Sequence, residues 1–232
     1  MEKSQILLEY LKKYLEISEP IPTTEKEKFL FYCSAVNKLP GSAVTESFLK
    51  IEDAYLSEQI KRSDIIDVSK KETQLIAVKK EAAFFSADAV LSFVTQCKDK
   101  SVYVFGGTRL KTQVVKALAK ENITVTKSNN LFYKGVISAR LPEITQKLTS
   151  VILDEVIKTY KFALDSAESL NLKSMVLCVP SIQNSLIESR IATAVINEIK
   201  SHKAYNKVKI VIAVSDDNSF NTYQKQIQGG IL

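Results

Sequence analysis

The sequence predicts an α/β fold in which a mixed, mostly parallel sheet lies between helices and follows a helical extension. Apolar residues up to about residue 65 recur at three- and four-residue spacing, as on one face of a helix. From about residue 72, short apolar runs alternate with helical stretches, and such alternation builds a parallel sheet. We therefore expect a helical N-terminal extension over residues 1–65 and an α/β domain over residues 66–232.

The extension favours three helices and shows no residues that carry chemistry. Pro20 and Pro22 end the first helix, and Thr23 or Thr24 can cap a second over residues 26–36. The third helix has an apolar stripe at helical spacing, which comprises Phe48, Ile51, Tyr55 and Ile60.

The α/β part alternates strands with helices. Runs rich in β-branched and other apolar residues predict strands over residues 73–80, 87–93, 123–126, 133–142, 174–180 and 207–214. Helical spacing predicts helices over residues 110–122 and 149–173, and Ser185 with Glu188 fits a capping box that starts another.

The strand over residues 87–93 raises a question about function, because α/β sheets bind ligands at the carboxyl ends of their strands. The run from Ser86 to Cys97 begins as a strand buried on both faces. Its end offers only Ser92, Thr95, Gln96 and Cys97, which is little for a catalytic site.

Two other segments could hold a ligand. Residues 105–111 (FGGTRLK) open a helix, so backbone N–H groups at Gly106 and Gly107 could cradle a phosphate, although a tight turn is the simpler interpretation. Residues 180–188 (PSIQNSLIE) link a core strand to a helix, but they contain no glycine to let a phosphate approach the backbone.

Cysteine and histidine are too few for most metal sites. Cys33, Cys97 and Cys178 are far apart in sequence and form no CxxC pair, and His202 is the only histidine. We expect Cys178 to be a small buried core residue and His202 to lie on the surface near a helix C-terminus.

The distribution of charged and apolar residues argues against specific nucleic-acid binding and against a membrane partner. The formal net charge is +6, but the basic residues are spread among acids, which favours weak, nonspecific association with nucleic acid at most. No apolar run reaches the roughly 20 residues that cross a bilayer, so we expect no membrane partner and a cytoplasmic protein.

Seven segments, taken in order, resemble one known family. They are residues 21–36 (IPTTEKEKFLFYCSAV), 48–60 (FLKIEDAYLSEQI), 86–90 (SADAV), 105–111 (FGGTRLK), 129–142 (NNLFYKGVISARLP), 170–182 (LNLKSMVLCVPSI) and 219–224 (SFNTYQ). Together, from about residue 6 to 223, they are similar to the zinc-containing macrodomains, protein-ADP-ribose hydrolases with a helical N-terminal extension. The resemblance implies a macrodomain-like fold and a cleft for ADP-ribose.

The resemblance also implies where a ligand would lie. Glu81 and Ala82 match the acidic motif that reads the adenine, with its glycine lost. The diphosphate loop of the family matches Ser181, Ile182 and Gln183. The same comparison adds Asn184, which follows in that loop, and Thr95, which ends the ribose motif, to the candidate ligand-binding residues.

Several features of active relatives are missing. In active relatives the matching strand ends in an Asn-Ala-Ala-Asn motif that holds the distal ribose, whereas residues 92–95 here are Ser-Phe-Val-Thr. A further Asn that lies beside the ligand in the family is replaced by Ala213. The loop with the Cys and His zinc ligands is absent, because residues 96–100 lead almost directly into residues 101–107. The family places a helix over that last segment, whereas its own composition favours a strand, and both alternatives stay open.

We therefore predict a catalytically silent, macrodomain-like binding or interaction module without catalytic residues, zinc or cofactor. The alternatives are a residual binder of ADP-ribose or a related nucleotide, or a weak ADP-ribosyl hydrolase, and a weak nonspecific nucleic-acid binder. The sequence identifies no protein partner.

Overall fold

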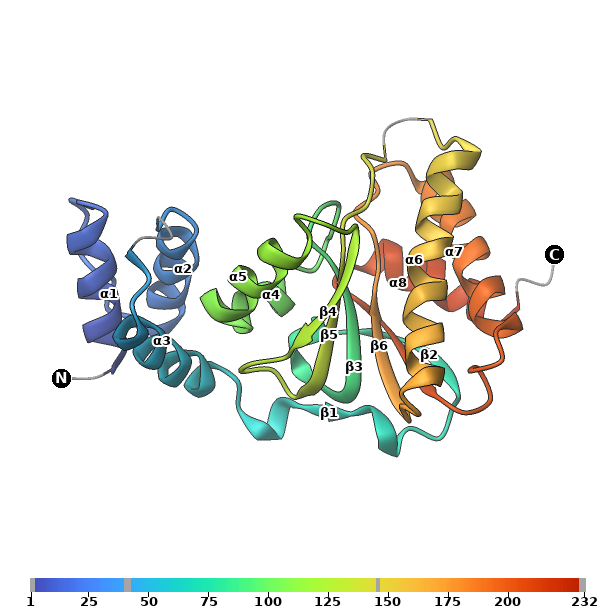
Figure 1. Ribbon diagram of the computed structural model, residues 1–232, viewed down its shortest axis with the longest axis horizontal. Helices are drawn as coiled ribbons and strands as arrows, with labels where there is room; N and C mark the ends of the chain where they lie inside the picture. Colours follow the sequence, from blue (N-terminus) through green and yellow to red (C-terminus); the bar gives the residue numbers. More distant parts are fainter. Residues whose placement is uncertain (1–2, 40–42, 145–146, 230–232) are drawn as a thin grey trace.

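The computed structural model describes residues 3–39, 43–144 and 147–229, beginning with the three predicted helices. These are α1 (Lys3–Tyr14), α2 (Glu25–Val36) and α3 (Glu46–Gln59), which form a separate group in Figure 1. Thr24, one of the two predicted caps, accepts a hydrogen bond from the Glu27 N–H at 3.3 Å, and Thr45 caps α3 in the same way. No described helix is long and apolar enough to span a membrane.

The α/β part contains one sheet with the strand order β2-β7-β6-β3-β5-β4, and β1 pairs with β3 beside this path. The strands are β1 (Ile66–Asp67), β2 (Leu75–Lys79), β3 (Phe85–Phe93), β4 (Ile123–Lys127), β5 (Tyr133–Ala139), β6 (Ser174–Cys178) and β7 (Lys209–Val214). Every pair is parallel except β4 with β5. The mostly parallel sheet is therefore confirmed, and the short β1 is an addition that the sequence did not reveal.

Helices cover both faces of the sheet. The short α4 (Ser101–Phe105) and α5 (Gly107–Ala117) lie on the side that faces α1–α3, and α6 (Ser150–Ser169) and α7 (Ser185–Ser201) cover the other (Figure 1). α8 (Asp217–Ile227) packs against α7, β2 and β7. The predicted fold class, a mixed sheet between helices, is confirmed.

Residues 101–105, for which the sequence left two alternatives, are helical. Asp99 accepts a hydrogen bond from the Ser101 N–H at 2.8 Å and so starts the turn. Val102 and Phe105, three residues apart, are then buried on one helix face. Local hydrogen bonding and burial thus outweigh the β propensity of the side chains.

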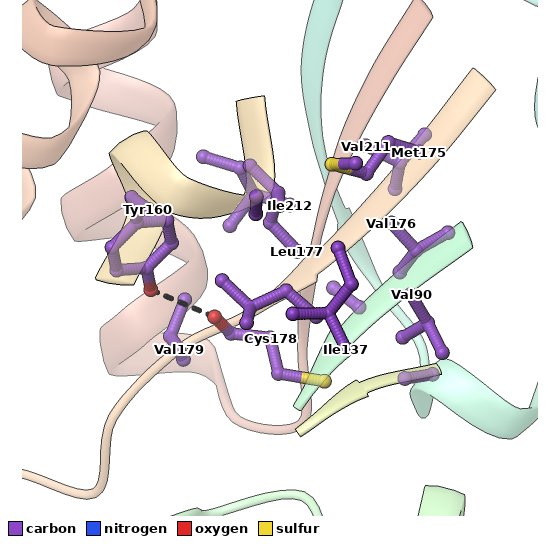
Figure 2. Packing of buried hydrophobic residues seen from close by; sticks show 14 of the residues in the cluster. Val90, Ile137, Tyr160, Met175, Val176, Leu177, Cys178, Val179, Val211 and Ile212 are labelled. Carbon is purple, nitrogen blue, oxygen red and sulfur yellow. Dashed lines mark hydrogen bonds between the residues drawn. The ribbon is translucent and has the colours of Figure 1, made fainter. Parts of the chain in front are cut away.

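The core explains why the central strands read as continuous apolar runs. Val136, Val90, Val176 and Val211 pair in register across β5, β3, β6 and β7, and all four are fully buried. Figure 2 shows Val90, Val176 and Val211 on neighbouring strands. Cys178 is also fully buried, as predicted, and its carbonyl accepts a hydrogen bond from the Tyr160 hydroxyl at 2.7 Å. Burying one such aliphatic side chain is worth about 1.5–3 kcal/mol.

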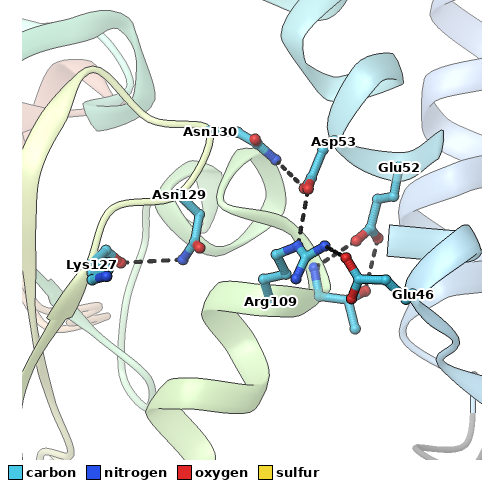
Figure 3. Close-up of polar contacts among 8 residues, drawn as sticks. Glu46, Glu52, Asp53, Arg109, Lys127, Asn129 and Asn130 are labelled. Atoms are coloured by element: carbon cyan, nitrogen blue, oxygen red, sulfur yellow. Dashed lines mark hydrogen bonds and ion pairs between the residues drawn. The ribbon is translucent and has the colours of Figure 1, made fainter. Parts of the chain in front are cut away.

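The three N-terminal helices have an apolar cluster of their own and dock onto α4 and α5. Phe29 of α2 contacts both this cluster and the main core, and its ring stacks on Phe105 with centroids 5.2 Å apart. At the edge of the interface, Arg109 forms ion pairs with Glu46 at 2.6 Å and with Asp53 at 3.0 Å (Figure 3).

A buried carboxylate, Glu52 of α3, lies at the centre of this interface (Figure 3). It accepts hydrogen bonds from the Thr108 N–H at 2.9 Å, the Thr108 hydroxyl at 2.8 Å and the Tyr32 hydroxyl at 2.7 Å. Gly107, the residue before Thr108, has a φ of +69°. A Cβ at this position would lie 2.9 Å from Leu56 and 3.3 Å from the Glu52 carboxylate. The close approach of α3 therefore requires glycine at this position.

His202 differs from its prediction. It ends α7 as expected, but it is only 8% exposed. Its Nδ1 accepts the Ala204 N–H at 3.1 Å and its Nε2 lies 3.0 Å from Asp165. The backbone bond to Nδ1 leaves Nε2 as the nitrogen that donates to the carboxylate, so the ring is a buried structural cap rather than a surface side chain.

We predict that Glu52→Gln lowers the free energy of unfolding by about 1–3 kcal/mol, because an amide cannot accept all the hydrogen bonds that converge on the carboxylate. Urea denaturation measures this change. The control is Glu58→Gln on the same helix, whose side chain is 55% exposed and pairs with Lys3, and which should change stability by less than about 0.5 kcal/mol. Equal effects of the two variants would contradict a special role for Glu52.

Candidate functional site

Two cavities that share lining residues open at the carboxyl ends of the parallel strands, the edge where the sequence predicted a ligand. The main cavity has a volume of about 550 Å³ and lies between Phe93 at the end of β3, Tyr103 of α4, Lys111 of α5 and Ser181 after β6. A minor cavity of about 280 Å³ lies beside Glu81. Lys100 and Val104 line both, so the two cavities are neighbours on either side of α4, and we refer to them together as the cleft.

The residues after β2 face the minor cavity only in part. Glu81 lines it, and burial together with the nearby Asp99 carboxylate raises the pKa of Glu81. Ala82 begins a short 3-10 helix, η4 (Ala82–Phe84), and is fully buried. Its N–H donates to Asp99 and its carbonyl accepts from the Tyr133 hydroxyl. Of these two candidates, Glu81 therefore has access to a ligand and the backbone of Ala82 is already bonded.

Thr95, at the predicted ribose position, turns away from the cleft. Its hydroxyl donates to the Leu141 carbonyl at 2.9 Å and accepts from the Leu141 N–H at 3.1 Å. The chain reverses at Gln96, which has a left-handed φ of +54°, and Gln96 then lines the main cavity. Such a conformation is costly for a residue other than glycine and is held here by its neighbours.

The loop after β6 places its four candidate residues in four environments. Ser181 lines the main cavity, and its N–H donates to the Gln96 carbonyl. Ile182 is buried in the core and Gln183 is exposed. Asn184 caps α7, since its side chain accepts from the Leu186 N–H at 3.0 Å and the Ile187 N–H at 3.2 Å. Ser181 alone of the four lines the cleft.

This loop also corrects the predicted capping box. Asn184 is the cap in place of Ser185, and Glu188 points inward, where it is only 3% exposed. Leu186 is 76% exposed, so neither it nor Gln183 fills the cleft, while Phe93 is buried and lines the main cavity.

Lys98 joins the loop after β3 to the other side of the cleft. Its ammonium lies 3.2 Å from Glu188, 3.3 Å from Asp216 and 2.7 Å from the Ser219 hydroxyl. Burial acts to raise the pKa of Asp216, but hydrogen bonds from Ser219 and the charge of Lys98 lower it overall. The charge of Lys98 is therefore balanced within the protein. A backbone bridge between Cys97 and Pro180 further connects the loops after β3 and β6.

Two thiols and a hydroxyl lie beneath the main cavity. Cys97 lines the cavity and donates to the Asp99 carbonyl at 3.0 Å, and a hydrogen bond from the Cys178 thiol lowers the pKa of Cys97. Tyr103 also lines the cavity, but its hydroxyl is buried and lies near the hydroxyls of Ser92 and Ser138. Burial raises the pKa of Tyr103.

The groups around Cys97 do not fit a zinc ion. Zinc in proteins takes about four N, S or O ligands, or three and a water. The nearby sulfur and carboxylate groups that act on Cys97 are the buried Cys178 and Asp99. The two carboxylate oxygens of Asp99 already accept hydrogen bonds from the backbone N–H groups of Ala82 and Ser101. Across the described parts of the chain, no group of three His, Cys, Asp or Glu residues is placed to hold a metal.

The other predicted ligand segment, residues 105–111, is already occupied by the protein itself. Thr108 in the first turn of α5 donates its N–H to Glu52, so a carboxylate from α3 stands where a phosphate could have bound. Lys111, two residues after Arg109 on this helix, instead faces the main cavity.

Sequence reasoning missed some of the groups that form the cleft. Lys111 ends a segment that was singled out for phosphate binding, but Lys100 and Tyr103 were not considered as ligand-binding residues. A signal existed for Asp99, since an Asp just before a helix commonly accepts its first free N–H groups. That signal could be used only if residues 101–105 were taken as a helix.

Comparison with known proteins establishes the fold. No protein-family model matches the chain. Among solved structures, it is similar to the macro domain of ganglioside induced differentiation associated protein 2, with a TM-score of 0.56, 16% identity and coverage of 70% of this chain and 94% of that one. A mutant of the Oceanobacillus iheyensis macrodomain gives a TM-score of 0.57 at 14% identity, over 66% of this chain and 90% of that one.

A third structure extends the likeness over the helical extension. The Trypanosoma brucei macrodomain in complex with ADP matches with a TM-score of 0.52 at 15% identity, over 98% of this chain and 97% of that one. At such identities the likeness concerns the fold, and the chain has the macrodomain fold with a sheet flanked by helices.

We predict that the purified protein contains no stoichiometric zinc and that a chelator leaves its thermal stability unchanged, because the cleft offers too few free ligands. Elemental analysis and thermal unfolding with and without EDTA measure this. One zinc per chain, lost together with stability on chelation, would contradict the analysis of the donor set.

Proposed function

We propose that the protein is a catalytically silent binding module with a macrodomain fold. The observation that supports this most is a cleft that is open, at about 550 Å³ in its main part, but whose polar groups mostly bond to other protein groups. Asp99 binds backbone N–H groups, Lys98 binds two carboxylates, and Ser181 donates its N–H to Gln96. A cavity of this size suits a small molecule.

Hydrolysis would require an activated water, and the cleft offers few groups to activate one. Glu81 is the carboxylate in the cleft that accepts no hydrogen bond from a described residue, but it lies at the minor cavity, on the far side of α4 from Ser181. His202 lies at the opposite end of α7, about 25 Å along a 17-residue helix from Asn184. General acid–base catalysis needs a group within hydrogen-bond reach of the reacting atoms.

Residual binding of ADP-ribose or a related nucleotide is the alternative that a specific observation favours. The resemblance assigns Glu81 to the adenine, and Glu81 does line a cavity that lies next to the main one. The expected supports for the diphosphate and distal ribose are weaker, since the Ser181 N–H is bonded and Thr95 turns away. This alternative therefore implies weak affinity.

The second alternative, nonspecific nucleic-acid binding, has less support. Several basic residues are neutralised by neighbouring acids, among them Lys79 with Asp217, Lys134 with Asp88 and Lys203 with Glu168. Any association should weaken steeply with salt, because it would rest on phosphate contacts alone.

We predict that ADP-ribose binds with a dissociation constant well above 10 µM, and a millimolar value is expected. Losing two or three neutral and two or three charge-assisted hydrogen bonds, those expected for the diphosphate and the distal ribose, removes roughly 5 kcal/mol or more, over a thousandfold in affinity. Isothermal titration calorimetry on the wild-type protein measures this. A constant at or below about 10 µM would favour the ADP-ribose reader over the silent module.

We also predict that the protein releases no ADP-ribose from ADP-ribosylated protein beyond the uncatalysed release measured in its absence. Misplacing reacting groups by about 1 Å already costs about a hundredfold in rate, and here the groups themselves are missing. Chromatography of the released nucleotide measures turnover. Clear release that Glu81→Gln or Cys97→Ser abolishes would refute the proposal, whereas release that neither variant changes would indicate a contaminating enzyme and leave it standing.

A further inference from the structure

The wall of the main cavity is largely apolar. Val104 and Val114 come from α4 and α5, and Phe93 from the end of β3. Val94 and Val115 extend this surface to the rim, where they are 41% and 65% exposed. Exposed apolar side chains that gather at a cavity mark a place where an apolar group of a ligand can be buried.

Two lysines at the same cavity lack a carboxylate partner. Lys100 and Lys111 both line it, and neither forms an ion pair within the described parts of the chain. Lys111 is partly buried and bonds only to the Asn37 side-chain oxygen at 2.9 Å. Burial lowers the pKa of Lys111, while the charge of the Glu52 carboxylate acts in the opposite direction without forming an ion pair with it.

Two basic residues close to them in sequence, Lys98 and Arg109, do have carboxylate partners. Lys98 and Arg109 each bind two carboxylates, so the protein does supply partners to cations in this region. Lys111 therefore stands out in this region as a basic side chain that faces the cavity without an ion-pair partner among the described residues. An anion placed there would compensate a partly desolvated ammonium, and such charge-assisted bonds are stronger than neutral ones.

Neutral polar groups complete the cavity. Asn37, Gln96 and Ser181 line it. A few polar side chains in a largely apolar cavity can fix the orientation of a ligand.

We propose that the main cavity binds a small amphipathic anion, with its aliphatic or aromatic body against Val94, Val114 and Val115 and its acidic head group between Lys100 and Lys111. This inference rests on the proposed function, because it assigns a ligand class to a cleft that binds without turnover. A carboxylate, phosphate or sulfonate supplies the same head-group chemistry, and the apolar body makes the ligand different from a free inorganic anion.

The test uses two fluorescent probes with the same apolar body. 1-Anilinonaphthalene-8-sulfonate carries an anionic head group, and N-phenyl-1-naphthylamine lacks it. We expect the sulfonate to bind the wild-type protein at least about tenfold more tightly than the neutral probe, the effect of one charge-assisted hydrogen bond. Equal affinities would overturn the role of the anion, and competition by inorganic phosphate as strong as by the sulfonate would overturn the role of the apolar body.

Variants then locate the site. Lys111→Gln should weaken sulfonate binding about tenfold and leave the neutral probe unchanged. Lys100→Gln, at an exposed position, should act in the same direction without affecting folding. The control is Lys116→Gln, which is exposed on the same helix and does not line the cavity. Equal effects of Lys111→Gln and Lys116→Gln would overturn the proposal.

The same protein samples separate this inference from the proposed function. Weak ADP-ribose binding with no discrimination between the two probes would overturn the amphipathic-anion site alone. Tight ADP-ribose binding or clear hydrolysis would overturn the silent module alone, whatever the probes show.

Discussion

The hydrogen bonds that converge on the Glu52 carboxylate fix the arrangement of the two parts of the protein. A helix N-terminus favours an anion, and here the anion comes from α3, so the first turn of α5 is bonded to the N-terminal helices. This docking brings α2 to the cleft, where Asn37 lines the main cavity and Phe29 and Cys33 line the minor one. The helical extension is therefore part of the candidate site. A substitution at Glu52 that loosens this docking should also displace the residues of α2 that line the two cavities.

The same principle recurs along the cleft. Polar groups at the carboxyl edge of a parallel sheet are the groups that usually bind a ligand. In this protein Asp99 binds the N–H groups of Ala82 and Ser101, Asn184 caps its own helix, and Lys98 is paired across the cleft with Glu188. Each of these bonds makes the edge more rigid and removes a group that could act on a substrate. The fold keeps its cavity while its polar groups serve the structure.

The sequence was informative where one physical effect dominates. Buried parallel strands read as apolar runs, so β3, β6 and β7 were predicted well. Residues 101–105 were ambiguous because their β-branched side chains favour a strand, and the Asp99 carboxylate that starts the helix acts through a contact that composition does not reveal. His202 was misjudged for a similar reason, since its partner Asp165 is distant in sequence. The resemblance placed Glu81 and Ser181 at the cleft, but Lys100 and Tyr103 were not considered, and Lys111 was noted only as part of a segment expected to bind phosphate through its backbone.

Lys111 differs from Lys98 in that it is partly buried but forms no ion pair with a described carboxylate. Holding an ammonium in a partly apolar cavity costs free energy, and in most places this chain offsets that cost with a carboxylate, as at Lys98. Lys111 instead bonds to the neutral oxygen of Asn37, and the Glu52 carboxylate acts on it only from beyond ion-pair distance. An anion that enters the main cavity would supply the missing charge, while the valines around it would bury whatever apolar group the anion carries. The part of the cleft that is least complete by itself is therefore the part where a ligand would gain most.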